Sequence, residues 1–431
     1  MENDNVICIM GMGYVGLTLG AVMANKGFQV HGVEIDPPTL AVIRQGRAHF
    51  YEVNLDPLIR RAMKLGTLQV HETIPKDVAF DVFVVTVGTP LDDAGRARMD
   101  MVEHVTDEIC RSMRDGAMVI LRSTVLLGTC LKVVKPRLDR TGRSYHLCYC
   151  PERTVEGKAL EELVALPQIV GGLNEESVER AMSMFRRLTP TIVRVSSLPA
   201  AELVKLLDNS YRDLFFAFGN EVAMMCESAG IDGQEVIRAA NMGYSRTAIA
   251  RPGFVGGPCL EKDPHILMES LQPHGFVPGL IQRGRAINES MVEYVFEAVM
   301  KALPRRDSVV VTLMGLAFKG QPETDDLRGS MALRMRTLFQ QRAPRVRLQG
   351  QDYVCSRDAI ARAGFVVVDD QEAFRGVDAV IVMNDNRRYI ALDIEQRATL
   401  MGRPAVIYDC WNLFQSNLDL PAGVTLHVFG R

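Results

Sequence analysis

Residues 5–27 read NVICIMGMGYVGLTLGAVMANKG, and this stretch decides the fold. A short apolar run ends in glycines, a helical pattern follows, and Gly27 closes the helix. The next residues, 28–36 (FQVHGVEID), indicate a second strand. The three pieces form one strand–helix–strand unit of about 30 residues, which predicts a parallel sheet.

The glycines of this unit fit a dinucleotide site. Gly11-Met12-Gly13-Tyr14-Val15-Gly16 has the pattern GxGxxG between a strand and a helix. The first glycine allows a tight turn, the second lets backbone approach a pyrophosphate, and the third lets helix and strand pack closely. The unpaired N–H groups at the start of the helix favour an anion there.

Two acids end the second predicted strand, Glu34 and Asp36. A carboxylate at this place accepts hydrogen bonds from ribose hydroxyls and repels a 2′-phosphate, so NAD is favoured over NADP. A glycine-rich turn that binds nothing and an FAD site are the alternatives.

The remaining pattern predicts an α/β chain with two Rossmann-like parallel-sheet domains, joined by a long central helix and a small helical dimerisation domain. Further buried strands are expected in 80–87, 117–125, 145–152 and 167–172, and a second set in 307–316, 346–350, 364–369, 377–383 and 405–409. Between them, residues 200–229 predict one helix that is apolar on nearly every side and therefore buried. The expected domains are 1–199, 200–303 and 304–431.

Composition argues against several classes of protein. The 49 basic and 52 acidic side chains give a net charge of −3, which offers no field for nucleic acid or an anionic membrane. The 9 cysteines are scattered, without zinc-type spacing, so no metal is expected, and reduced thiols in the cytoplasm are the simplest reading. No apolar run reaches the length of a membrane span.

The most unusual stretch is FVGGPCLEKDP, residues 254–264. Adjacent glycines let backbone or a ligand come close to the thiol of Cys259. Lys262 and Asp263 follow closely enough to tune that thiol. The competing reading is a small buried cysteine that only fills space.

The long predicted helix carries polar residues at helical spacing. The residues on one face are Lys205, Asn209, Arg212, Phe216 and Asn220, and a lysine inside an apolar run is costly to bury without a partner. This favours a lined pocket, and the alternative is an edge that faces water or a partner chain.

Four further residues are weaker candidates. Thr89 and Thr124 end strands, where ligands of open α/β sheets bind, although threonine also caps strand ends. Glu152 and Glu156 lie four apart after a strand, where they could orient water or accept a proton. The alternative for these acids is the first turn of a helix.

Together these segments resemble the UDP-glucose and UDP-N-acetylmannosamine dehydrogenase family. The resemblance covers nearly the whole chain, in order, through GMGYVGLTLG, VGTP, STV, CPERTVEGKALEEL, ELVKLLDNSYRDLFFAFGNE, RPGFVGGPCLEKDP and GLAFKGQPETDDLRGS. It implies an N-terminal domain that binds NAD, a C-terminal domain that binds UDP, and a homodimer built on the central helix.

The resemblance also implies roles for individual residues. Cys259 is the implied nucleophile, Lys205 stabilises the oxyanion and assists proton transfer, and Asn209 is its hydrogen-bonding partner. Asp263 and Thr124 position the catalytic water and the lysine, with Glu152 and Glu156 as acids of the same site. The implied cofactor contacts are Gly11, Gly13, Tyr14, Val15, Gly16, Glu34, Asp36, Thr89, Thr124, Lys262 and Arg328. The implied substrate contacts are Arg153, Thr154, Lys205, Asn209, Arg212, Tyr244, Arg246, Gly256, Phe318 and Lys319, of which Arg246 reaches the neighbouring subunit's substrate.

The implied reaction oxidises the C6 alcohol of a UDP-sugar to a carboxylate. Two hydrides pass to two NAD, and the intermediate aldehyde is held on Cys259 as a thiohemiacetal and then a thioester. Arg153 and the segment NSYRD (209–213) are similar to the N-acetylhexosamine branch, so UDP-N-acetylmannosamine is favoured over UDP-N-acetylglucosamine and UDP-glucose. The other classes left open are a binding protein without catalysis and a two-electron 2-hydroxyacid or phosphogluconate-type dehydrogenase.

Overall fold

The computed structural model describes residues 5–414 and 417–431. Its contacts divide the chain into two compact units, and each is described by itself. The first contains residues up to 208 together with 265–277, and the second contains 209–264 together with 278–431. Each unit is built on one mainly parallel sheet, which confirms the predicted α/β fold with two parallel-sheet domains. The three-domain division stays a prediction.

The sheet of the first unit has 8 strands in the order β3-β2-β1-β4-β5-β6-β7-β8. Strand order reverses between β1 and β4, so a ligand crevice is expected outside the carboxyl ends of these two strands. The strands are β1 (Val6–Met10), β2 (Gln29–Val33), β3 (Leu68–His71), β4 (Val82–Val85), β5 (Ala117–Leu121), β6 (Tyr145–Tyr149), β7 (Gln168–Gly172) and β8 (Ile192–Arg194).

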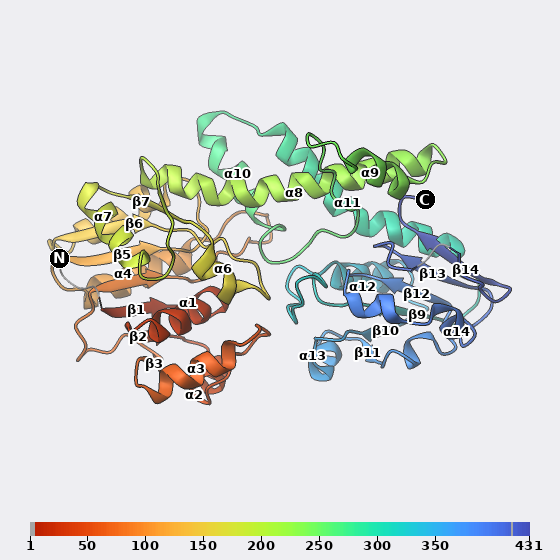
Figure 1. Ribbon diagram of the computed structural model, residues 1–431, viewed down its shortest axis with the longest axis horizontal. Coiled ribbons are helices and arrows are strands. Elements are labelled where there is room, and N and C mark those ends of the chain that lie inside the picture. Colours follow the sequence, from red (N-terminus) through yellow and green to blue (C-terminus); the bar gives the residue numbers. More distant parts are fainter. Residues whose placement is uncertain (1–4, 415–416) are drawn as a thin grey trace. The chain divides into compact units, whose positions relative to one another are not determined.

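Helices cover both faces of this sheet (Figure 1). Alternate residues of β1 enter two different cores, with Ile7 and Ile9 in one and Cys8 and Met10 in the other. A strand buried on both faces reads as a continuous apolar run, which is why its sequence does not alternate. The helices are α1 (Tyr14–Asn25), α2 (Pro37–Arg44), α3 (Leu55–Lys64), α4 (Asp100–Ser112), the π-helix η1 (Cys130–Val134), α5 (Lys135–Asp139), α6 (Ala159–Ala165), α7 (Glu175–Phe185), most of α10 (Asp263–Leu271) and the 3-10 helix η2 (Gln272–His274).

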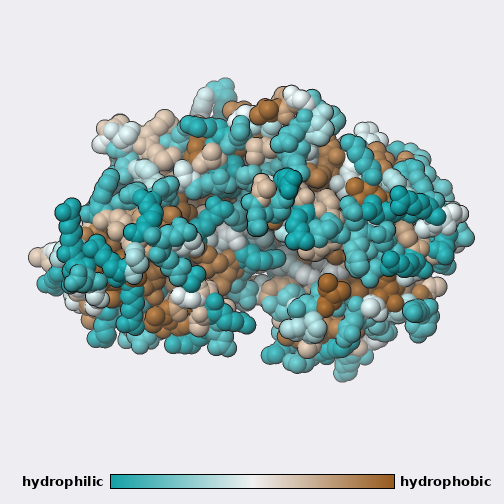
Figure 2. Space-filling view, turned by 180° about the vertical axis from the view of Figure 1, so that it is seen from behind, coloured by the Kyte–Doolittle hydropathy of each residue, from teal (hydrophilic) through white to brown (hydrophobic). Residues whose placement is uncertain are grey.

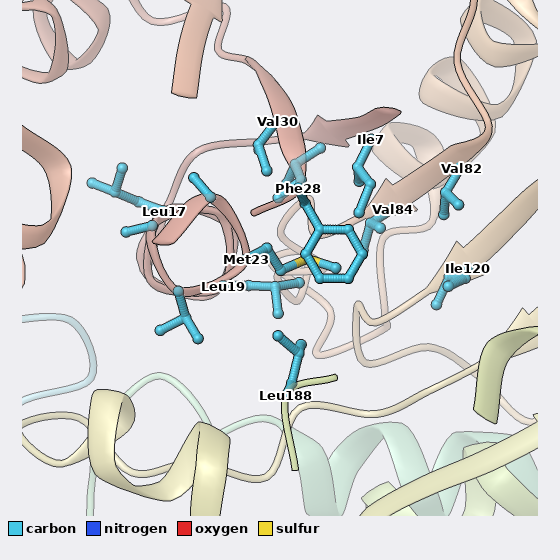
Figure 3. Close-up of a cluster of buried hydrophobic side chains, with 14 of the residues drawn as sticks. Ile7, Leu17, Leu19, Met23, Phe28, Val30, Val82, Val84, Ile120 and Leu188 are labelled. Carbon is cyan, nitrogen blue, oxygen red and sulfur yellow. The ribbon is translucent and has the colours of Figure 1, made fainter. Parts of the chain in front are cut away.

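Phe28 lies at the centre of the core under α1. Figure 3 shows its ring among Ile7, Met23, Val84 and Leu188, so one side chain joins α1, two strands and the segment after α7. The guanidinium of Arg187 covers the ring at 3.5 Å from its centroid. This packing holds α1, and with it the glycine-rich turn, against the sheet.

The second unit repeats the doubly wound plan with 6 parallel strands in the order β11-β10-β9-β12-β13-β14. The strands are β9 (Val309–Met314), β10 (Val346–Gln351), β11 (Val366–Val367), β12 (Ala379–Val382), β13 (Ala405–Asp409) and β14 (Val424–Val428). Its helices are α9 (Gly233–Asn241), α11 (Gly279–Ala302), α12 (Met331–Arg342), α13 (Arg357–Arg362), η3 (Glu372–Phe374), η4 (Arg387–Ala391) and α14 (Ile394–Ala398).

The predicted long helix is α8, Leu198–Ser228, with 31 residues. It begins in the first unit and continues into the second. One expectation is wrong: α8 is not buried on nearly every side, because Tyr211, Phe218 and Met225 are exposed in the single chain. In Figure 2, hydrophobic residues likewise reach the surface among hydrophilic ones in the helical part at the top of the view.

Two strand expectations also need correction. Residues 168–172 run antiparallel to β6 instead of extending the parallel order, although α6 lies between the two strands in the chain. The predicted strand in 364–369 is reduced to the two residues of β11 at the sheet edge. Within the described residues, none of the helices is long and apolar enough to cross a lipid bilayer.

The central position of Phe28 gives a stability prediction. Phe28→Ala leaves a cavity under α1, so we expect the free energy of unfolding of the first unit to fall by about 3–5 kcal/mol. Denaturant titration followed by circular dichroism measures this change. Leu65→Ala, at a side chain that is 62% exposed, is the matched control and should stay within about 0.5 kcal/mol. Equal denaturation midpoints for Phe28→Ala and Leu65→Ala would contradict the assignment of Phe28 to the core.

Candidate active site

The glycine-rich turn has the geometry that a pyrophosphate requires. Gly11 has φ +96°, a conformation that L side chains rarely adopt. A Cβ on Gly16 would lie 1.9 Å from the carbonyl oxygen of Gly11, so only glycine lets α1 come this close to the turn. A Cβ on Gly13 would meet nothing within 4 Å, which leaves its backbone open to a ligand. The residues present therefore fit NAD.

Glu34 is fixed beside this turn. Its carboxylate accepts hydrogen bonds from the backbone N–H groups of Met12 (3.0 Å) and Asp36 (3.0 Å). The side chain of Asp36 instead caps α2 by accepting from the N–H of Thr39 at 2.9 Å. The two predicted acids therefore have different local roles, and Glu34 is the one held at the turn.

Tyr14 joins the turn to the loop that follows β6. Its hydroxyl bonds to Glu52, whose carboxylate also accepts from the N–H groups of Gly157 (2.7 Å) and Ala159 (3.0 Å). Burial raises the pKa of Tyr14 far above its usual value, and the hydrogen bond to Glu52 and the charges of Glu52 and Glu156 raise it further. Glu52 was not expected from the sequence, because a single acid in a loop gives no signal of this role.

Glu152 is buried against Arg122, which also donates to the carbonyl of Cys150 at 3.1 Å. Burial alone would raise the pKa of Glu152, but the charge and hydrogen bond of Arg122, the N–H of Thr154 and the charge of Lys205 lower it below its usual value. Glu152 is therefore an ionised carboxylate at neutral pH, and its lowered pKa makes it a weak base whose charge serves to hold Arg122 and to act on Lys205.

The same part of the first unit contains the strand-end threonines and the lysine. The hydroxyl of Thr89 donates to the carbonyl of Thr124 at 2.6 Å, so the two predicted segments meet and Thr89 has a structural bond. Lys205 of α8 is buried, with 7% of the residue exposed, and its charge acts on Glu152. Arg153 pairs with Asp208 of α8 at 2.9 Å.

In the second unit, Cys259 lies in a turn just before α10 and is exposed. The carbonyl of Cys259 accepts from the N–H of Asp263 at 2.9 Å. Asp263 is fully buried and accepts from Asn209 of α8 (2.5 Å) and from Lys262 (2.7 Å). The structure therefore brings together four residues predicted for the chemistry.

A cavity of about 130 Å³ lies beside this turn, within the second unit. Four predicted substrate contacts line it: Arg212, Gly256, Phe318 and Lys319. The other lining residues are Phe216, which lies on the face of α8 predicted to line a pocket, and Arg251, Gly253, Phe254, Val255, Leu260, Gln321, Asp385 and Trp411. Sequence reasoning gave no individual role to Arg251, Gln321 or Trp411. Three cations against one carboxylate suit a diphosphate, and the aromatic rings suit a base.

Gly256 and Gly257 make this cavity possible. A Cβ on Gly257 would lie 2.4 Å from the ring of Phe318, and a Cβ on Gly256 would lie 2.3 Å from the carbonyl oxygen of Gly329. Any side chain here would push the cysteine turn away from the segment 315–330. Steric contact therefore explains why residues 256 and 257 are both glycine.

Tyr244, Arg246 and Arg328 are among the predicted ligand contacts that do not line this cavity. Arg246 donates to the hydroxyl of Tyr244 at 3.1 Å, and both side chains are exposed. Arg328 pairs with Asp326 at 2.6 Å on the surface of the second unit. Their assigned contacts with a neighbouring substrate and with NAD stay predictions.

Comparison with known proteins agrees with this geometry. Three models of the UDP-glucose/GDP-mannose dehydrogenase family match the chain in order: the NAD binding domain at residues 5–189, the central domain at 199–290 and the UDP binding domain at 312–416. A UDP-N-acetyl-D-mannosamine dehydrogenase of Campylobacter jejuni is 31% identical over 77% of this chain and 83% of its own.

Solved structures agree as well. The UDP-D-ManNAc dehydrogenase of Pyrococcus horikoshii is 28% identical and superposes with a TM-score of 0.88 over 99% of both chains. A UDP-glucose dehydrogenase of Pyrobaculum islandicum is 25% identical, with a TM-score of 0.87 over 99% of this chain and 98% of its own.

The protein is thus an NAD-dependent oxidoreductase that acts on nucleotide sugars. It belongs to the UDP-glucose/GDP-mannose dehydrogenase family. The predictions of an enzyme and of NAD as cofactor are confirmed.

Gly16 and Gly13 differ in the space around them, so the same substitution should have different effects at the two positions. Gly16→Ala forces a Cβ into the Gly11 carbonyl, so we expect it to destabilise the first unit by about 1–3 kcal/mol. Gly13→Ala has room for its Cβ, so it should leave stability within about 1 kcal/mol and weaken NAD binding by obstructing the pyrophosphate. Thermal unfolding and calorimetric titration with NAD distinguish the two effects. Unchanged NAD affinity in Gly13→Ala would argue against this turn as the cofactor site.

Proposed function

We propose that this chain oxidises UDP-N-acetyl-D-mannosamine at C6 to the uronate, with Cys259 as the covalent nucleophile. The observation that carries the proposal is an exposed thiol in a turn that is tied to buried Asp263 and Asn209 and borders a cation-lined, aromatic cavity. The names of similar proteins from Pyrococcus horikoshii and Campylobacter jejuni support this sugar.

The first step removes two electrons from the alcohol. Bound NAD would accept the hydride of C6, and water would accept the hydroxyl proton. Glu152, which Arg122 keeps ionised, is a weak base, and its charge can orient that water or the ammonium of Lys205. The cation of Lys205, which the resemblance assigns to the oxyanion, would stabilise negative charge on the sugar oxygen.

The second step uses the thiol. Sulfur of Cys259 would add to the aldehyde carbon, and the thiol proton would pass to the aldehyde oxygen. A second NAD would accept the hydride of this thiohemiacetal as its hydroxyl loses a proton, and water would then hydrolyse the thioester to the carboxylate and the thiol. Asp263 is buried and charged beside the turn, where it can order the amide of Asn209 and the ammonium of Lys262. Covalent capture keeps the reactive aldehyde from leaving between the two oxidations.

Stoichiometry tests this assignment against its alternatives. We expect two NADH for each sugar consumed, with the highest kcat/KM for UDP-N-acetylmannosamine in a panel that includes UDP-N-acetylglucosamine, UDP-glucose and GDP-mannose. One NADH per sugar would favour a two-electron dehydrogenase. Tight binding of a nucleotide sugar without formation of NADH would favour a non-catalytic binding protein.

Substitution of the thiol tests the nucleophile. Cys259→Ser should lower uronate formation by on the order of 10³-fold or more, because the aldehyde is no longer captured as a thioester precursor. Cys226→Ser, at a half-buried thiol in α8, is the matched control and should retain activity. Full activity in Cys259→Ser would refute the mechanism.

We propose further that the chain forms a homodimer through α8. Tyr211, Phe218 and Met225 are 67%, 51% and 52% exposed and follow one another at intervals of seven residues. This spacing places them on one stripe of the helix, as in helix pairs that bury such a stripe. A cytoplasmic location stays an expectation, which agrees with nine cysteines that form no disulfide among the described residues.

A charge on this stripe should separate the subunits. Phe218→Asp would place an unpaired carboxylate in the helix interface, so we expect a monomer in analytical ultracentrifugation where the unmodified chain is a dimer. Leu65→Asp, an exposed apolar position in the first unit, is the control and should leave the mass unchanged. A monomeric unmodified chain would contradict the dimer.

A further inference from the structure

We infer that a buried polar network of Asp213, Asn220, Arg285 and Asn288 positions the cysteine turn, with Arg285 as its central positioning residue. The inference deepens the proposed function and rests on it, because it assigns a task to residues that hold the nucleophile. None of the four was singled out as part of the thiol's setting by the sequence.

Arg285 of α11 reaches the turn on both sides of the thiol. Its side chain is 1% exposed. One terminal nitrogen, Nη1, donates to the carboxylate of Asp213 (2.7 Å) and to the carbonyl of Leu260 (2.9 Å), and Nη2 donates to the carbonyl of Val255 (3.4 Å). One guanidinium therefore binds backbone before and after Cys259.

Two asparagines connect Asp213 to the backbone of Gly253, which precedes the turn. Asn288, also on α11, donates to the carboxylate of Asp213 at 2.9 Å and to the Asp213 carbonyl at 2.8 Å. Asn220 of α8 donates to Asn288 at 3.0 Å and accepts from the N–H of Gly253 at 2.8 Å. Two helices thus bind three backbone groups of the segment 253–260.

The chemistry of this network favours positioning over simple packing. Burial lowers the pKa of Arg285, and the charges of Asp213 and Glu289 oppose that effect. A buried ion pair is seldom better for stability than apolar residues of equal volume, but its directional bonds are satisfied in only one arrangement. Here that arrangement fixes the two carbonyls that flank the nucleophile.

The turn has further contacts besides those with Arg285. The N–H of Gly257 donates to the carbonyl of Gly329 at 2.9 Å, and Glu261 pairs with Arg334 of α12. The turn is therefore bonded both to Arg285 and to the segment 329–334. The position of Cys259 relative to the cavity is therefore set by bonds and not by packing alone.

Loss of this positioning has a specific chemical consequence. The first hydride transfer does not use the thiol, so the alcohol can still become an aldehyde with one NADH formed. If sulfur is displaced, the aldehyde carbon is not captured and the aldehyde leaves. Each released aldehyde accounts for one NADH, whereas each uronate accounts for two.

The primary test is the double variant Asp213→Asn/Arg285→Met, which removes the donors to Val255 and Leu260 without leaving a buried carboxylate unpaired. We expect uronate formation to fall about 100-fold, the ratio of NADH to sugar to move from two toward one, and KM for NAD to stay within about twofold. Aldehyde released is trapped with semicarbazide and quantified by mass spectrometry.

A second variant and a control keep the test decisive if the double variant fails to fold. Asn220→Ala removes only the bond to Gly253 and the bond to Asn288, and it should release trapped aldehyde to a smaller extent. Tyr389→Phe removes an equally buried hydrogen bond, to Gln351 at 2.9 Å, that involves no residue of the segment 253–264, and should release none. Circular dichroism shows which variants are folded.

The outcomes separate this inference from the proposed function. A folded network variant that still yields two NADH per sugar and no aldehyde overturns the positioning role. Equal loss of both oxidation steps overturns it as well, because the first step does not need the thiol. Full activity of Cys259→Ser overturns the nucleophile itself, whatever the network variants do.

Discussion

Parallel strand pairing is the constraint on which the site of the first unit depends. Because β1, β2, β4, β5 and β6 all run the same way, the segments that follow them emerge at one edge of the sheet. The glycine turn, Glu34, Thr89, Thr124 and Glu152 come from five such segments. If neighbouring strands were antiparallel, alternate segments would lie at the opposite edge of the sheet. The strand β7, which is antiparallel to β6, comes after Glu152 in the chain and so does not affect these five segments.

Much of this arrangement follows from sequence because it depends on local chemistry. Gly11 and Gly16 are predictable, since a left-handed conformation and a 1.9 Å clash leave no other residue possible. The long helix is predictable from 31 residues with few breakers. Thr89 and Thr124 are found as strand ends, but the hydrogen bond between them depends on how β4 and β5 pair.

Other features depend on contacts between distant residues and carry no local pattern. Glu52 is one acid in a loop, yet it binds segments more than 100 positions away. Arg122 and Arg285 look like ordinary arginines, and burial makes them partners of Glu152 and Asp213. The exposed stripe on α8 does not follow from the sequence. A helix that is apolar on all faces has the same sequence pattern whether another element of the chain or a second chain covers it.

The distribution of thiols has a practical consequence for chemical labelling. Of the nine cysteines, Cys259 is exposed, while six are buried and two are intermediate. Burial raises the pKa of Cys8, Cys130, Cys148, Cys150, Cys355 and Cys410, so these remain protonated and shielded from electrophiles. A maleimide dye or a mild oxidant should therefore modify one atom of the chain first, which makes this position a natural handle for an activity-linked reporter and the point at which oxidative stress would act.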